Sequence, residues 1–128
     1  MTEPSPSFDS LLDAVSDERA TRARTIAFAL VTAYDHDVSD HEVERFGQLI
    51  GGDGEAFRAL ATTMKGDLDG ATEWARGYLA DERGDPRATR AIVEAARIAA
   101  IADAQLAERE EIALHVVAVA LGLDPDEV

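Results

Sequence analysis

Two acidic segments of the chain share one pattern, and this internal repeat is the feature that most constrains the fold. Residues 35–42, DHDVSDHE, and residues 103–110, DAQLAERE, both fit D-x-x-[VL]-x-[DE]-x-E. An alanine-rich apolar segment precedes each copy, and an amphipathic segment follows it. Apolar residues at helical spacing predict helices on both sides of each acidic segment. We therefore expect two duplicated helix–corner–helix units that pack about a pseudo-two-fold axis and bury the helix before each corner.

The rest of the chain also has helical patterns, and capping residues mark their boundaries. Gly51 and Gly52 end the helix after the first corner, and Asp53 begins the next one. Asp85 followed by Pro86 is a strong signal for a helix start. No segment has a convincing strand pattern. The sequence thus predicts an all-α domain of about seven helices, which begin near residues 8, 17, 40, 53, 67, 86 and 108.

Three further predictions concern burial. The sixth helix is apolar most of the way round over residues 98–102, which predicts a central, buried helix, and the seventh is similar. Trp74 and Tyr78 lie four residues apart on one helix face, which favours core packing over a partner-binding groove. His115 lies within the apolar run HVVAVA, which favours a core or boundary histidine over a metal ligand.

Length and composition set the class of protein. The 128 residues fit a single domain. Pro4 and Pro6 make residues 1–6 a disordered lead-in, so the domain is expected to cover residues 7–128. The chain has no cysteine, which excludes disulfides, zinc–thiolate sites and thiol catalysis.

The net charge of −14 limits the partners. Such a protein is repelled by nucleic acid and by anionic lipid headgroups, and it favours cations or basic protein surfaces. The first residues have neither the basic nor the apolar part of a signal peptide. No run of about 18 apolar residues predicts a membrane span. We therefore expect a cytoplasmic protein with a protein partner, without nucleic acid or membrane insertion; the sequence leaves the oligomeric state open.

The two repeat copies, with the helices around them, resemble the tellurite-resistance TerB family. The resemblance is carried by TIAFALVTAYDHDVSDHEVERFGQLIG and by AARIAAIADAQLAEREEIALHVVAVALGLDPDEV. It covers residues 24–51 and 88–128, whereas residues 53–85 carry none of it. The family often has glycine after the first aspartate of each corner, where this chain has His36 and Ala104.

This resemblance implies an all-helical TerB-like fold and a role in the response to tellurite and other toxic oxyanions. It also implies that the acidic corners are candidate cation-binding sites. Both implications go beyond what composition and spacing indicate by themselves.

The first corner is not an EF-hand, although it begins like one. A calcium loop that starts at Asp35 would place Asp37 and Ser39 at its third and fifth positions. Its sixth position needs glycine and has Asp40, and its twelfth needs glutamate and has Phe46. Any cation at this corner is therefore bound in another geometry.

Helix capping is the alternative to a cation site. Ser39 and Glu42 form a capping box, in which the serine caps the helix and the glutamate reaches back. Capping does not explain Asp35 and Asp103, because both end apolar helices, where a negative charge opposes the helix dipole. These two aspartates are explained either by local hydrogen bonds to the next helix or by a bound cation.

If a cation binds, oxygen ligands favour Ca²⁺ or Mg²⁺. Zn²⁺ is less favoured: His36 and His41 flank Asp37, but they are five residues apart across a corner, and the second copy has no histidine. The candidate metal ligands are Asp35, Asp37, Glu42, Asp103 and Glu110.

Enzymatic signatures are missing from the sequence. It contains no GxSxG, phosphate-binding loop or HExxH motif. Glu73, Asp81 and Glu82 could pair as catalytic carboxylates, but an acidic helix face explains them better. We therefore predict a non-catalytic stress-response module that acts through cation or protein binding. The alternatives are a metal-free interaction or scaffold domain and an enzyme built around an ion at the corners.

Overall fold

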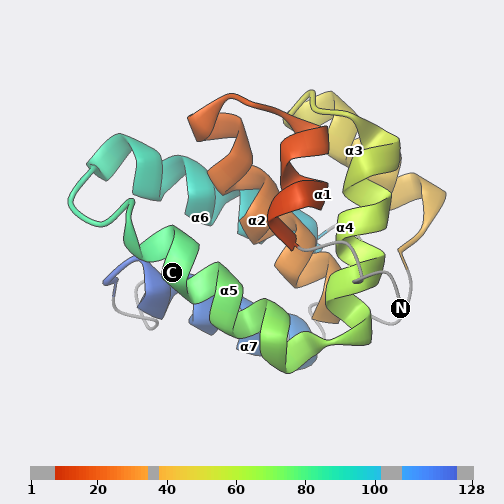
Figure 1. Ribbon diagram of the computed structural model, residues 1–128. Helices are drawn as coiled ribbons and strands as arrows, with labels where there is room; N and C mark the ends of the chain where they lie inside the picture. The colour runs from red at the N-terminus through yellow and green to blue at the C-terminus, as the bar shows by residue number, and fades with distance from the viewer. Residues whose placement is uncertain (1–7, 35–37, 102–107, 124–128) are drawn as a thin grey trace, which may run out of the picture.

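The computed structural model describes residues 8–34, 38–101 and 108–123, and these ranges contain seven α-helices and no strand (Figure 1). The expected all-α class is thereby confirmed. The lead-in predicted for residues 1–6 lies outside the described residues. The helices are α1 (Phe8–Val15), α2 (Arg19–Tyr34), α3 (Asp40–Leu49), α4 (Gly54–Gly66), α5 (Leu68–Ala80), α6 (Pro86–Ile101) and α7 (Glu108–Ala120).

Helix α2 is the centre of the fold. It runs between α6 on one side and α1 and α4 on the other (Figure 1), and it also contacts α5 and α7. Most of its residues are buried, including the hydroxyls of Thr25 and Thr32. These hydroxyls donate to the carbonyl oxygens of Thr21 and Phe28, at 2.7 and 2.8 Å, so their burial leaves no donor unsatisfied. The prediction that the helix before the first corner is buried is confirmed.

Three fully buried phenylalanines join α2 to the helices after the first corner. The rings of Phe46 on α3 and Phe57 on α4 stack with centroids 4.2 Å apart and planes 8° apart. Phe28 on α2 meets both rings edge-on, at 5.8 and 5.6 Å. Edge-to-face and offset contacts are the preferred geometries of aromatic pairs. This cluster fixes α3, and hence the exit of the first corner, relative to α2.

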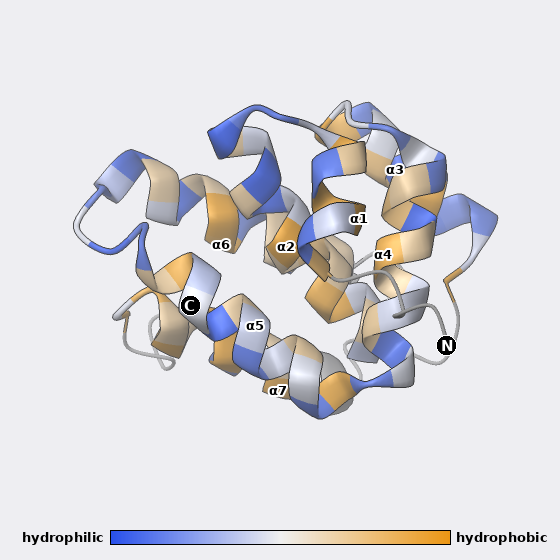
Figure 2. Ribbon diagram, in the orientation of Figure 1, coloured by the Kyte–Doolittle hydropathy of each residue, from blue (hydrophilic) through white to orange (hydrophobic). Residues whose placement is uncertain are grey.

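The prediction of a buried sixth helix concerned residues 98–102, of which only the side chains of Ile98 and Ala99 are described, and both are partly buried against the core. The prediction that the seventh helix is similarly buried is wrong for its described part. Helix α6 buries one face, with Ile92 at its centre, but Ile98 is only half-buried. Helix α7 leaves Ile112 49% and Val119 47% exposed, although residues 112–120 are apolar apart from His115. Figure 2 shows hydrophobic residues, in orange, on the part of α7 that α5 does not hide. The reason is tertiary: α7 contacts α2, α5 and α6, and these neighbours cover only part of its surface. His115 is also exposed, contrary to the expected core or boundary position.

Trp74 and Tyr78 pack against the core, as predicted. The Trp74 ring lies 5.2 Å from the ring of Phe8, and its indole Nε1 donates to Asp9 Oδ1 at 3.0 Å. The Arg22 guanidinium lies over the Tyr78 ring, 5.9 Å from its centroid. The Trp74 contacts join α1 to α5, and the Arg22 contact joins α2 to α5. None of the described helices is both long and apolar enough to cross a membrane.

Candidate functional site at the first acidic corner

The structure describes one side chain of the predicted cation site. Glu42 lies in the first turn of α3 and is 5% exposed. The predicted ligands Asp35, Asp37 and Asp103 fall outside the described residues. Glu110 lies in the first turn of α7, and its side chain is likewise outside the description. The proximity of the five residues therefore stays a prediction.

Ser39 starts α3 as the predicted N-cap. Its backbone is extended, with φ −81° and ψ 160°, and its hydroxyl accepts from the Glu42 backbone N–H at 3.3 Å. This bond satisfies one of the amide groups that a helix start leaves without a backbone partner. The backbone N–H of Glu42 is thus used by the cap. The cap holds the Glu42 backbone in the first turn of α3, and so sets the position from which its side chain extends.

The burial of the Glu42 carboxyl group is the feature of this corner that bears on cation binding. A carboxylate taken out of water is costly unless hydrogen bonds, a proton or a cation compensate for the lost hydration. Glutamate is among the residues least often buried. A buried glutamate directly after an acidic corner is therefore a suitable anchor for a cation.

Arg58 on α4 contacts the corner from the side, and the sequence analysis missed it. Its Nη1 donates to the carbonyl oxygen of Val38 at 3.4 Å, and its Nη2 forms an ion pair with Asp40. Asp40 is therefore neutralised by a protein cation and is a poor candidate for a metal ligand. No local pattern could have revealed Arg58, because the contact depends on how α4 folds back along α3.

Zinc gains no support from the described side chains. His41 is exposed on α3, and His36 falls outside the described residues. Within the described part of the chain, no three Asp, Glu or His side chains gather closely enough to hold a metal ion.

Glu82 does not belong to a solvated acidic face, and that interpretation was wrong. It is 7% exposed, and its Oε1 accepts from Arg19 Nε at 2.9 Å. This hydrogen bond, together with the charge of Glu82, raises the pKa of Arg19 above its ordinary value. Glu73 and Asp81 remain exposed. The pair ties the start of α2 to the turn after α5, and its partners are 63 residues apart in sequence.

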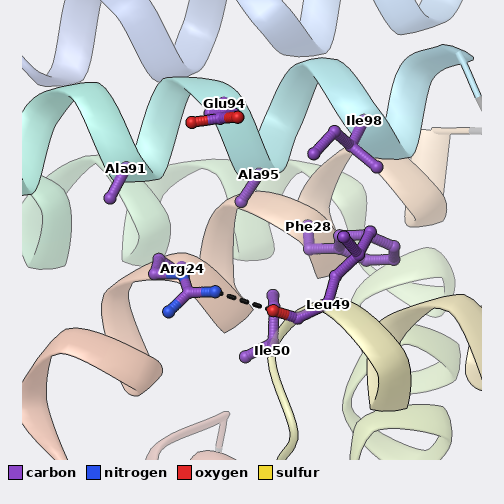
Figure 3. Close-up of a pocket in the computed structure, with 8 residues that line it drawn as sticks. All are labelled: Arg24, Phe28, Leu49, Ile50, Ala91, Glu94, Ala95 and Ile98. Atoms are coloured by element: carbon purple, nitrogen blue, oxygen red, sulfur yellow. Dashed lines mark hydrogen bonds between the residues drawn. The ribbon is translucent and has the colours of Figure 1, made fainter.

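A small cavity of about 240 Å³ lies between α2, α6 and the end of α3 (Figure 3). Phe28, Ile50 and Ile98 supply apolar walls, and Arg24 and Glu94 are its charged groups. Arg24 Nη2 donates to the carbonyl oxygen of Leu49 at 2.9 Å (Figure 3), which caps the end of α3. Ligand pockets usually measure about 300–1,000 Å³, so this cavity is too small for most organic ligands.

The fold and the corner together define an all-helical domain whose central helix leads into an acidic, capped turn. Comparison with known families identifies the family of this domain. Residues 21–128 match the family described as tellurite resistance protein TerB. This match spans most of the chain, so the protein belongs to the TerB family, and the resemblance drawn from the two repeat copies is confirmed. No curated protein and no solved structure matches the chain.

Proposed function

We propose that this TerB-family protein is a non-catalytic, cytoplasmic module of the response to tellurite and other toxic oxyanions. In this proposal it acts by binding a divalent cation at the corner between α2 and α3. The position of the Glu42 carboxylate, buried in the first turn of α3 directly after the acidic corner, is the observation that carries the proposal. Family membership supports the stress-response role.

The chemistry of the corner favours a hard cation. Its acidic residues offer carboxylate oxygens, which suit Ca²⁺ and Mg²⁺ better than softer metals. In the proposal Asp35 and Asp37 complete the coordination begun by Glu42. Asp103 and Glu110 form the equivalent site in the second copy of the repeat.

The second candidate function is a metal-free protein-interaction domain. It is favoured by a groove beside α6 that combines exposed arginines with apolar side chains. A partner bound in this groove would not exclude a cation at the corner, since the corner and the groove involve different helices.

Thermal unfolding of metal-stripped protein, with and without saturating Ca²⁺ or Mg²⁺, tests the proposal. A ligand that binds only the folded state raises the midpoint, and 100-fold excess over Kd adds about 2.7 kcal/mol to the free energy of unfolding. We expect this shift in the wild type and a smaller one in Glu42→Gln, which leaves only the site of the second copy intact. The matched control is Glu44→Gln, an exposed glutamate two residues along the same helix. An equal shift in both variants, or none in the wild type, would contradict the proposal.

A further inference from the structure

Helix α6 carries a net positive charge in this acidic protein, as α2 does. Between residues 86 and 101 it has three arginines and one glutamate, a net charge of +2 in a chain whose net charge is −14. The arginines are Arg87, Arg90 and Arg97, and all three are exposed. No ion pair joins them to a carboxylate in the described part of the chain, whereas Arg19, Arg22 and Arg58 each have one.

Two of these arginines line a groove that also has apolar side chains. The groove measures about 460 Å³ and lies between α6 and Leu123, in the segment that follows α7. Val93 and Leu123 supply its apolar side chains, and Arg90, Glu94 and Arg97 supply its charges. Leu123 is 37% exposed, so its side chain is accessible from the groove. We call this feature the α6–Leu123 groove.

The far wall of the groove is held firmly in place. The backbone N–H of Leu123 donates to the carbonyl oxygen of Ala118 at 2.9 Å, which closes the end of α7. Arg83 adds bonds from its Nε and Nη2 to the carbonyl oxygens of Ala120 and Val119, at 2.7 and 3.3 Å. The position of Leu123 relative to α7 is therefore fixed before any partner arrives.

We propose that the α6–Leu123 groove binds an acidic amphipathic helix of another protein. Arg90 and Arg97 are seven residues apart, which places them on one side of α6 about 10 Å from each other along the axis. A helix laid alongside α6 would meet them with two carboxylates that are also seven residues apart. An aliphatic side chain between these carboxylates would rest on Val93 and Leu123.

Glu94 indicates which type of residue the partner helix has between its two carboxylates. It lies between Arg90 and Arg97 in the groove, so it repels an acid placed halfway and favours an apolar residue there. The partner is expected to have the order acid, apolar, acid. The net charge of −14 opposes every anionic ligand, but a short helix with two facing carboxylates is repelled less than nucleic acid, an anionic lipid surface or a second copy of this chain. This inference does not rest on cation binding at the first corner.

A synthetic helical peptide provides the probe. It has about 18 residues, or five turns, with glutamates seven residues apart and leucines between them, and it carries fluorescein. Fluorescence anisotropy is measured against the full chain. We expect saturable binding that weakens at least tenfold in Arg90→Glu/Arg97→Glu and in Leu123→Ser. Glu94→Gln is expected to bind more tightly. Arg76→Glu, an exposed arginine on α5, is expected to match the wild type.

Several outcomes would overturn the proposal. One is failure of the peptide to bind, or equal binding by the wild type and the double arginine variant. Another is equal binding of a peptide with the same composition but scrambled leucines. Tighter, arginine-dependent binding to phosphatidylglycerol vesicles or a single-stranded DNA oligonucleotide would assign the groove to those ligands instead. Arginine-dependent dimerisation in sedimentation equilibrium would assign it to a second copy. Circular dichroism is used to check that each variant is folded.

Discussion

Arg83 Nε donates to the carbonyl oxygen of Ala120 at 2.7 Å, so the turn after α5 binds the last turn of α7. The contact places a positive charge at a helix C-terminus, where it stabilises the helix dipole and satisfies a carbonyl without a backbone partner. The two residues are 37 positions apart, and their bond links the middle of the chain to its last described helix.

Removal of this contact should destabilise the protein measurably. We expect Arg83→Ala to lower the free energy of unfolding by about 1–2 kcal/mol, as for the loss of a hydrogen bond from a charged donor. Urea denaturation measures the change. Arg87→Ala is the control, because Arg87 is exposed and has no ion pair within the described residues. Equal effects of the two substitutions would show that the Arg83 contact adds nothing.

The phenylalanine cluster should account for much more of the stability. Phe57→Ala removes a fully buried ring that contacts both Phe46 and Phe28, and such truncations cost about 3–5 kcal/mol. The expected result is a large drop in the denaturation midpoint, or loss of the folded state. Leu49→Ala, at an exposed leucine of α3, should change the free energy of unfolding by less than about 1 kcal/mol.

Two glycines should respond to alanine in opposite directions. Gly122 has φ +75°, a conformation that disfavours any side chain, so Gly122→Ala should cost about 1 kcal/mol or more. Gly77 lies inside α5, and a Cβ added there meets no atom within 4 Å. Gly77→Ala should therefore stabilise the protein by about 0.5–1 kcal/mol. Differential scanning calorimetry measures the unfolding midpoint of both variants. Midpoint shifts of the same sign would contradict the prediction that the two substitutions have opposite effects.

Capping and cation binding at the first corner can be separated by substitution. Ser39→Ala removes the hydroxyl that accepts from the Glu42 amide and should cost about 1 kcal/mol of stability. It leaves the Glu42 carboxyl group in place, so stabilisation by Ca²⁺ should persist. Glu42→Gln should show the reverse pattern. If Ser39→Ala reduced the Ca²⁺ effect as strongly as Glu42→Gln, cation binding would depend on the cap, and the predicted separation of the two roles would be wrong.

The sequence was most informative where the signal is local. Asp85 and Pro86 predicted the start of α6, and the structure shows Asp85 Oδ1 accepting from the amides of Arg87 and Ala88 at 3.1 and 3.2 Å. Gly51 predicted the end of α3 and has φ +85°. These signals depend on neighbours within one helical turn, and a linear sequence contains all of them.

The sequence was least informative where the partner is distant. The contacts of Arg58 with the first corner and of Arg19 with Glu82 depend on how helices pack, so no local pattern predicts them. The prediction that α7 is buried was wrong for the same reason. Apolar residues indicate which surface a helix could bury, but the helices packed against it decide which surface it does bury. At the candidate site, Ser39 was predictable because a cap is local. Whether Asp103 lies near its own partners remains a prediction.

Calorimetric titration of the metal-stripped full chain with Ca²⁺ and Mg²⁺ tests the central claim most directly. We predict saturable heat for the wild type, and affinity at least tenfold lower, or about 1.4 kcal/mol, for Glu42→Gln. Asp35→Ala/Asp103→Ala should lose binding, and Glu44→Gln should match the wild type. Absence of saturable heat in the wild type, or unchanged affinity in Glu42→Gln, would contradict a cation site anchored by that buried carboxylate.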